Sequence, residues 1–248
     1  MEPRYYYALF MFLALLAFVI VRRLQPKASE LLRMPWWQRT ALTLAAFVGG
    51  VLGAKASFAL TETHEWFDYH DWFRAWFRDG KTITTGLIGA YLAVEMAKLA
   101  LGIRVKTGDS FALPLACAMA VGRWGCFLNG CCYGTPTTLP WGVSFHLPDG
   151  DVVRCHPTQI YESLFHLTMA SVLLLLMRYD LLRYQRLKLY LICYCVYRFV
   201  TEFIRPEPIW WAGLTFYQWA AIVLAAGLVV HWVWDSRLVK SERGLAAA

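Results

Sequence analysis

The sequence predicts an all-α fold: a polytopic membrane bundle of seven transmembrane helices, with the N-terminus outside and the C-terminus in the cytoplasm. Hydrophobic residues make up 58% of the 248 residues and charged residues only 17%, whereas soluble domains contain about 25% charged residues. Apolar runs of about 20 residues, the length that spans a bilayer, recur along the chain. Lys and Arg concentrate in alternate connections between these runs. These observations argue against a soluble enzyme, and we expect one membrane domain over residues 1–248.

The first apolar run, residues 5–21, predicts a retained transmembrane helix. It lacks the basic leading segment and the Ala-x-Ala exit of a signal peptide, and Arg22 and Arg23 follow it directly. Six further runs predict the other helices: residues 41–60, 82–101, 111–128, 158–177, 189–204 and 214–234. Helices are expected because lipid leaves the unpaired backbone of an open sheet without hydrogen-bond partners.

The charge of the connections predicts the orientation, because cytoplasmic loops are rich in Lys and Arg. Basic residues lie after the first, third and fifth runs and in the tail: Arg22, Arg23, Lys27, Arg33, Arg39, Arg104, Lys106, Arg178, Arg183, Arg186, Lys188, Arg237, Lys240 and Arg243. All of them lie on one side of the membrane if the N-terminus is outside. The net charge of +7 therefore indicates loops that face an anionic membrane surface, and we expect no nucleic-acid partner.

The opposite connection, residues 61–81, carries five acidic residues together with aromatic residues at helical spacing. A helix of this kind lies in the membrane interface. It would act either as an aromatic belt that anchors the bundle or as a lateral lip that admits lipid. The aromatic residues are Trp66, Tyr69, Phe73, Trp76 and Phe77.

Ionisable residues within the sixth run indicate a functional site, because each costs about 2.5–3.5 kcal/mol to insert into a membrane. Tyr194, Arg198, Glu202 and Arg205 follow one another at steps of four, four and three residues, so they share one helical face. Arg198 and Glu202 can form an ion pair, which would serve only to dock the helix. The second arginine leaves a surplus cation, which favours an anionic ligand such as a phosphate.

A glycine-rich segment, residues 122–134, ends the fourth run and carries Arg123 near bilayer depth. Its four glycines allow close approach of the backbone to a ligand; the alternative is a tight turn with a snorkelling arginine. Pro157 then opens the fifth run, and Glu162 inside it requires a cationic partner, Arg123 or an arginine of the sixth run. His156 is the candidate titratable group near neutral pH, although a lone histidine is more often structural.

These motifs, in this order, resemble those of the bacterial prolipoprotein diacylglyceryl transferases, over nearly the whole chain. The Gly-Arg loop of that family corresponds to Gly122-Arg123-Trp124-Gly125, Phe127, Asn129-Gly130 and Gly134. Its later motifs correspond to Pro140-Trp141-Gly142, to His156-Pro157-Thr158-Gln159-Ile160-Tyr161-Glu162, and to Tyr194, Arg198, Glu202 and Arg205. Seven helices with an external N-terminus also match the family.

The resemblance implies a multi-pass enzyme of the bacterial plasma (inner) membrane, active in lipoprotein biosynthesis. It would move diacylglyceryl from phosphatidylglycerol, or another anionic phospholipid, to the thiol of a lipobox cysteine in a preprotein. Glycerol phosphate would leave. We expect no cofactor and no metal.

In such an enzyme, Arg123, Arg198 and Arg205 would hold the phosphate and offset the charge of the leaving group. The acceptor thiol must become a thiolate, for which His156 or Glu162 is the candidate base. Gln159 and Tyr194 would orient the headgroup, and Glu202 would fix Arg198. The remaining predicted substrate-binding residues are Asn129, Gly134 and Tyr161.

The chain departs from the family pattern at three places. The His-Gly-Gly motif of the third helix is Thr84-Thr85-Gly86, the loop asparagine is Cys126, and an acidic residue after Asn-Gly is Cys131. Binding of the lipid phosphate therefore carries over better than the acceptor chemistry does. The alternatives are a transferase with a different acceptor and a non-catalytic phospholipid-binding or thiol-redox membrane protein of the same fold.

Four cysteines, Cys126, Cys131, Cys132 and Cys155, are expected on the outer, oxidising side. The leading interpretation is a disulfide from Cys131 or Cys132 to Cys155. The second is a reactive thiol whose pKa Arg123 lowers. Metal binding is disfavoured, because C-x4-C-C lacks the usual C-x2-C spacing.

Overall fold

The computed structural model describes residues 3–26, 32–61, 82–146 and 150–246. The predicted aromatic helix within residues 61–81 lies outside the described residues, apart from Thr61. The chain divides into two compact units. The first unit comprises residues 1–28, 106–208 and 225–248, and the second comprises residues 29–105 and 209–224. The expectation of a single domain stays a prediction.

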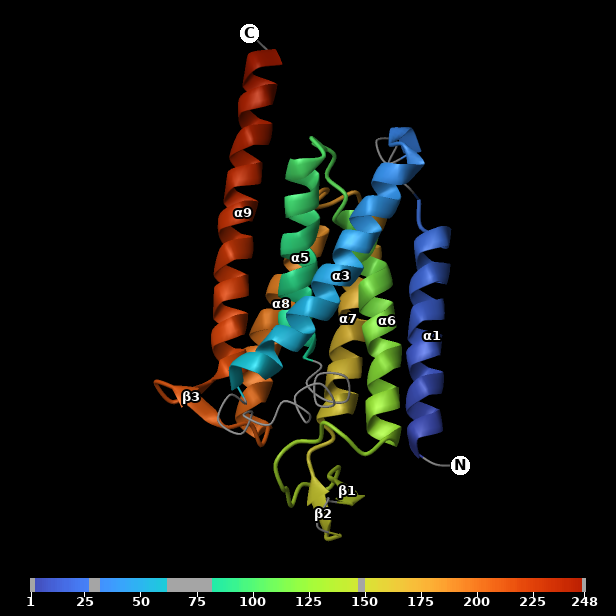
Figure 1. The fold of residues 1–248 in the computed structure, drawn as a ribbon, viewed down its shortest axis with the longest axis vertical. Coiled ribbons are helices and arrows are strands. Elements are labelled where there is room, and N and C mark those ends of the chain that lie inside the picture. The colour runs from blue at the N-terminus through green and yellow to red at the C-terminus, as the bar shows by residue number, and fades with distance from the viewer. Residues whose placement is uncertain (1–2, 27–31, 62–81, 147–149, 247–248) are drawn as a thin grey trace. The chain divides into compact units, whose positions relative to one another are not determined.

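Each of the seven predicted runs falls on an α-helix (Figure 1). The helices are α1 (Pro3–Leu24), α3 (Trp36–Thr61), α5 (Ile83–Ala100), α6 (Asp109–Leu128), α7 (Thr158–Arg178), α8 (Arg186–Thr201) and α9 (Phe216–Ala246). Within the described residues, α1, α5, α6, α7 and α9 are long and apolar enough to cross a membrane, whereas α8 has only 16 residues. The protein is therefore a multi-pass, mainly helical membrane protein, and the seven-span count and the orientation stay predictions.

Two short hairpins, which the all-α prediction did not contain, lie in the connections between helices. Strands β1 (Val143–His146) and β2 (Val152–Cys155) pair antiparallel between α6 and α7, with Val143 opposite Cys155. Strands β3 (Ile209–Trp211) and β4 (Leu214–Thr215) pair between α8 and α9, after a 3-10 turn, η1 (Glu202–Ile204). The sixth apolar run therefore ends as an α-helix three residues earlier than predicted.

In the first unit, α6 packs against α1, α7 and α8. Its small and apolar residues Leu113, Ala116 and Ala120 are buried. At Gly125 a Cβ atom would lie 2.8 Å from the Cβ of Phe10 on α1, too close for any side chain. Small residues of this kind allow close helix packing in membranes, where lipid supplies no hydrophobic drive to association. The glycines at the end of α6 thus seat this helix against α1.

In the second unit, α3 and α5 cross at very short range through glycines. A Cβ at Gly53 would lie 2.3 Å from the carbonyl oxygen of Thr85, and one at Gly49 would lie 2.4 Å from that of Gly89. Thr84 and Thr85, at the position of the His-Gly-Gly motif of the family, are buried in the first turn of α5. The glycines around residue 50 therefore act in helix packing.

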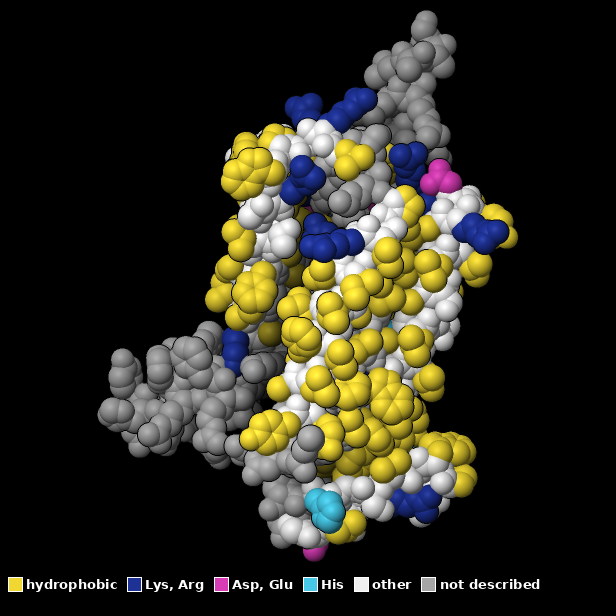
Figure 2. All heavy atoms as spheres, turned by 90° about the vertical axis from the view of Figure 1, so that its right-hand side faces the viewer, with side chains coloured by type: hydrophobic (Ala, Val, Ile, Leu, Met, Phe, Trp, Pro, Cys, Tyr) yellow, Lys and Arg dark blue, Asp and Glu magenta, His cyan; other side chains and the backbone are white. Residues whose placement is uncertain are grey.

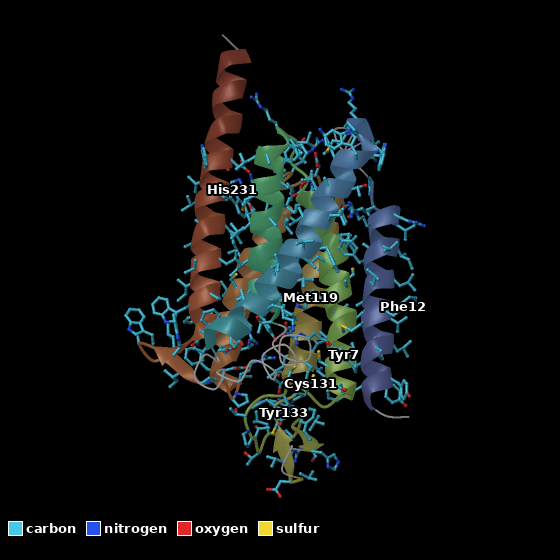
Figure 3. The ribbon with its side chains drawn as sticks, in the orientation of Figure 1. Tyr7, Phe12, Met119, Cys131, Tyr133 and His231 are labelled. Atoms are coloured by element: carbon cyan, nitrogen blue, oxygen red, sulfur yellow. The ribbon has the colours of Figure 1, made fainter. Side chains whose placement is uncertain are left out.

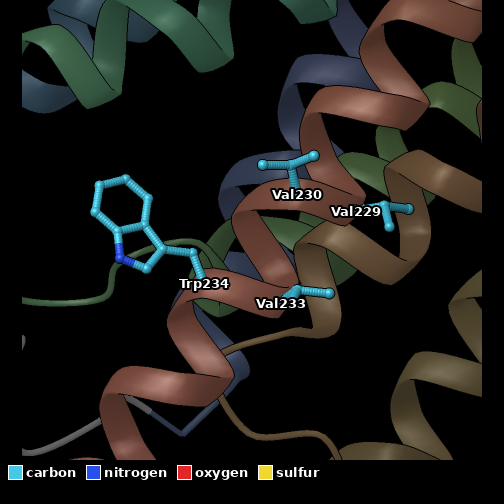
Figure 4. A pocket seen from close by; sticks show the side chains of 4 residues that line it. All are labelled: Val229, Val230, Val233 and Trp234. Atoms are coloured by element: carbon cyan, nitrogen blue, oxygen red, sulfur yellow. The ribbon is translucent and has the colours of Figure 1, made fainter.

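The outward face of α1 is apolar, as expected of a surface that meets lipid. Phe12 and Leu15 are each 62% exposed, and Figure 2 shows hydrophobic side chains across the face on which α1 lies. On α9, a hollow of about 290 Å³ is lined only by apolar side chains (Figure 4): Val229, Val230, Val233 and Trp234. Such a surface suits acyl chains and contains none of the ionisable residues singled out above.

Candidate active site in the first unit

The candidate site is centred on the carboxylate of Glu162, which lies in the second turn of α7 and is only 1% exposed. Its Oε1 lies 2.5 Å from Nη2 of Arg123 on α6 and accepts a hydrogen bond of 2.9 Å from the hydroxyl of Tyr194 on α8. Its Oε2 lies 3.9 Å from Nη2 of Arg205. Three segments distant in the sequence thus meet at one buried charge, whose burial requires these partners.

A second ion pair adjoins the first. Nη2 of Arg198 lies 2.8 Å from Oε2 of Glu202, four residues later, and both side chains are buried. Arg198 also interacts electrostatically with Glu162. The predicted pairing of Arg198 with Glu202 is confirmed, and of the alternative partners predicted for Glu162 the structure has Arg123 in the ion pair.

The cluster carries an excess of positive charge, because three guanidinium groups face two carboxylates. The Nε of Arg123 is buried and has no hydrogen-bond partner among the described residues. Buried donors are rarely left unpaired in proteins, so such a donor is a position for a ligand oxygen. Charge and unused donor together indicate a site for an anion.

Local sequence explains why these groups converge. On α7, Gln159, Glu162, Ser163 and His166 are buried and follow one another at helical spacing, so they form one polar stripe. The hydroxyl of Ser163 donates a 2.9 Å hydrogen bond to the carbonyl oxygen of Ala120 and so fixes α7 against α6. This contact places Arg123 and Glu162 at the same level.

His166 belongs to the site and was missed in the sequence. It is fully buried, its Nε2 lies 3.7 Å from Oε1 of Glu162, and its Nδ1 lies 2.9 Å from the hydroxyl of Tyr190. Its ring also stacks on that of Tyr194, at 5.3 Å between centroids. The sequence signal for His166 was its spacing of four residues from Glu162, which places both side chains on one helical face. The apolar neighbours of His166 hid this signal.

The glycine-rich segment is fastened over this cluster by its backbone carbonyls. That of Cys131 accepts a 2.5 Å hydrogen bond from Nε2 of Gln159, and that of Cys132 accepts one of 2.7 Å from Oγ1 of Thr158 and one of 3.3 Å from Arg205. Gln159, which was predicted to bind the headgroup, therefore uses its amide nitrogen to hydrogen-bond the loop. Its Oε1 has no hydrogen-bond partner among the described residues.

At position 134 there is no room for a side chain, so a glycine is required. Its N–H donates to the carbonyl oxygen of His156 at 2.8 Å, and a Cβ there would lie 2.5 Å from the carbonyl oxygen of Ile204. Any side chain would push the loop away from η1, which leads to Arg205. The structure thus gives Gly134 a packing role.

The other predicted residues lie beside the cluster. Nδ1 of His156 lies 3.3 Å from the hydroxyl of Tyr161, and no hydrogen bond or ion pair described in the structure joins either side chain to Glu162. Asn129 caps the C-terminus of α6, next to the cysteines. The catalytic and binding roles of these three residues stay predictions.

The predicted disulfide to Cys155 is absent: all seven cysteines are free. Cys155 is buried in β2, where burial raises the pKa of its thiol. The sulfurs of Cys126, Cys131 and Cys132 instead lie within 4.8 Å of one another. Figure 3 shows Cys131 just beyond the end of α6.

The second interpretation, a thiol activated by Arg123, has geometric support. Hydrogen bonding with Cys126 and Cys131 lowers the pKa of the Cys132 thiol, and the charges of Arg123 and Arg205 act in the same direction. Nη1 of Arg123 lies 3.9 Å from the sulfur of Cys126. The same arginine therefore faces both Glu162 and the thiols.

Comparison with known proteins gives one family. The profile of the prolipoprotein diacylglyceryl transferases matches residues 3–234. The chain is 34% identical over 154 residues to phosphatidylglycerol–prolipoprotein diacylglyceryl transferase 2 of Streptomyces coelicolor, across 59% of this chain and 48% of that protein. It is 33% identical over 172 residues to the Clostridium tetani transferase (67% of this chain, 68% of the relative) and 31% identical over 216 residues to that of Geobacillus kaustophilus (84% and 78%).

The chain thus spans about half the length of the Streptomyces coelicolor relative and about two thirds or more of the other two. The match to the family profile runs through every segment that builds the cluster, from α6 to the residue after η1. This protein therefore belongs to the prolipoprotein diacylglyceryl transferase family.

Proposed function

We propose that this protein transfers diacylglyceryl from phosphatidylglycerol to the lipobox cysteine of a prolipoprotein in the bacterial plasma membrane. The observation that carries the proposal is the cluster of Arg123, Arg198 and Arg205, whose charge exceeds that of Glu162 and Glu202. The substrates are those in the names of the related proteins. A phosphodiester meets the need of the cluster for an anion.

The reaction is a displacement at carbon. The acceptor thiolate attacks the glyceryl carbon that carries the phosphate, the S–C bond forms, and the C–O bond to the phosphate breaks. Glycerol phosphate leaves with the electron pair, and the thiol proton passes to a base, for which His156 and Glu162 are the candidates. The arginines stabilise the charge that grows on the leaving phosphate, which is the contribution expected of donors fixed before the reaction.

The proposed orientation places the site at the outer face. With seven spans and an external N-terminus, α6 ends outside and α7 begins there, so the glycine-rich segment faces the outer leaflet. Phosphatidylglycerol would enter from that leaflet, with its acyl chains along apolar helix faces such as those of α1 and α9. A preprotein would present its cysteine after translocation.

A different acceptor is the second candidate. Cys126 stands where the family has an asparagine, and Thr84-Thr85 stands where it has His-Gly, although the arginine and glutamate side chains are kept. The charged residues proposed to bind the phosphate are thus kept, whereas residues that the family resemblance ties to the acceptor chemistry are replaced. Such a protein would bind phosphatidylglycerol and leave a lipobox peptide unmodified.

The test is to incubate the purified protein with phosphatidylglycerol and a lipobox peptide and to weigh the peptide by mass spectrometry. We expect a gain of one diacylglyceryl group, lost in Arg198→Ala and kept in the control Arg178→Ala, whose side chain is exposed at the end of α7. No gain by a folded protein that retains phospholipid would overturn the lipobox acceptor. No retained phospholipid would overturn the phosphate site as well.

A further inference from the structure

Cys126, Cys131 and Cys132 form a three-sulfur cluster that the proposed transfer does not use. All three sulfurs lie within 4.8 Å of one another, and those of Cys131 and Cys132 are 3.3 Å apart. Cys126 and Cys131 are partly buried, and Cys132 is exposed. The set is therefore compact and reachable from the surface.

The end of α6 explains how a C-x4-C-C spacing can gather three sulfurs. Gly130 has φ +68°, its N–H donates to the carbonyl oxygen of Phe127, and the N–H of Cys131 donates to that of Cys126. This pair of bonds is a Schellman motif, which reverses the chain directly after a helix. It returns Cys131 onto the last turn of α6, beside Cys126.

The backbone holds the third sulfur in place at some cost. Cys132 has φ +67°, a left-handed conformation that is unfavourable for a residue with a side chain. Thr158 and Arg205 fix its carbonyl oxygen, and Gln159 fixes that of Cys131. The three thiols are thus positioned before any ligand arrives.

The spacing of the sulfurs suits a soft metal ion. Thiolates bind such ions at about 2.3 Å, so three of them in a plane around one ion are about 4.0 Å apart. Thiolate ligands select ions such as Cu(I) and Zn(II) over hard cations. Among the described residues, no fourth His, Cys, Asp or Glu joins the group, which disfavours the tetrahedral protein site of Zn(II).

The charge of the site also favours a monovalent ion over a divalent one. Three thiolates around a monovalent ion carry two negative charges, and the guanidinium groups of Arg123 and Arg205, which also face Glu162, lie beside them. Nη1 of Arg123 lies 3.9 Å from the sulfur of Cys126, and Arg205 interacts electrostatically with Cys132. We propose that Cys126, Cys131 and Cys132 form a three-thiolate site for a soft monovalent cation, namely Cu(I).

The experiment uses the full chain in detergent, fully reduced and free of oxygen, with Cu(I) supplied as its coloured bicinchoninate complex. We expect the protein to withdraw one Cu(I) per chain and to bleach the colour in proportion. Cys131→Ser and Cys132→Ser should each lose stoichiometric withdrawal. Cys117→Ser, which changes a thiol of α6 outside the cluster, is the matched control and should bind as the parent does.

Three results would overturn the site. The first is a protein whose thiols all alkylate and which nevertheless leaves Cu(I) with bicinchoninate. The second is an equal loss of binding in Cys117→Ser. The third is stoichiometric uptake of Zn(II) without Cu(I), which would refute the assigned ion. No phospholipid or peptide is present, so the outcome is independent of the transferase assay.

Discussion

Nη2 of Arg123 and Oε1 of Glu162 lie 2.5 Å apart and join α6 to α7 where both side chains are almost fully buried. An ion pair in such surroundings is expensive to assemble, because both charges lose their water. Removing only one partner costs more free energy, because a single unpaired charge then stays buried. The pair therefore links two helices and is also part of the anion site.

We expect Arg123→Ala to destabilise the protein by about 3–5 kcal/mol, because Glu162 loses its nearest counter-charge. The double variant Arg123→Met/Glu162→Gln should recover most of that loss, since the two opposite charges of the pair are removed together. Thermal unfolding in detergent measures both, with Arg178→Ala as the control. A double variant no more stable than Arg123→Ala would contradict the pairing.

Arg198→Lys should keep the positive charge and still lower kcat of the transfer by about 100-fold, a loss of the size seen when one oriented donor is removed from a transition state. Lysine cannot reproduce the planar fork that faces Glu202 at 2.8 Å. Initial rates of peptide modification measure the effect. Rates equal to those of the parent protein would show that charge alone suffices at this position.

Tyr190→Phe should cost about 1–3 kcal/mol, because it leaves Nδ1 of the buried His166 without its 2.9 Å partner. Tyr179→Phe is the matched control, since Tyr179 is 68% exposed. Melting temperatures of the two variants compare the buried with the exposed hydroxyl. Equal melting temperatures would mean that the Tyr190 hydroxyl adds nothing to stability.

Asp109 in the first turn of α6 caps the start of α8. Its Oδ1 accepts a 3.0 Å hydrogen bond from the N–H of Arg186, and its Oδ2 accepts one of 2.6 Å from that of Tyr184. Asp109→Ala should therefore destabilise the protein by about 1–2 kcal/mol, the usual cost of losing a helix cap. Unfolding midpoints should fall for Asp109→Ala and stay unchanged for Arg178→Ala, which alters an exposed charged residue.

Gly53→Ala should destabilise the second unit by about 1–3 kcal/mol, because the added methyl group meets the backbone of α5 at 2.3 Å. Gly227→Ala is the matched control on α9, where nothing beyond the neighbouring backbone of its own helix lies within 4 Å of the new Cβ. It should be neutral or slightly stabilising, since alanine favours helix. The prediction fails if both variants unfold at the same temperature.

Sequence reasoning located the helices and two ion pairs for a physical reason. Membrane insertion requires long apolar runs, so the spans are visible in composition, and any charge inside them stands out. The spacing of Arg198 and Glu202 on one helix could be read directly. The position of these two residues relative to Glu162, which lies on another helix, is determined by helix packing and could not be read from the sequence.

Three features of the structure could not be predicted from the pattern of apolar residues. The hairpins β1–β2 and β3–β4 are too short to leave such a pattern. His166 was hidden by its apolar neighbours. The disulfide to Cys155 was wrong because the turn at Gly130 directs Cys131 back to Cys126, an effect of backbone conformation that residue spacing alone does not show.

Arg123 and Cys126 lie less than one turn apart on α6. A shift of this helix by a single residue, about 1.5 Å along its axis, would carry the guanidinium and the sulfur together past α7. The ion pair with Glu162 would then lengthen as the thiol cluster opened. The register of α6, set by its glycine contact with α1 and by the hydrogen bond from Ser163 of α7, therefore positions both the ion pair and the thiol cluster.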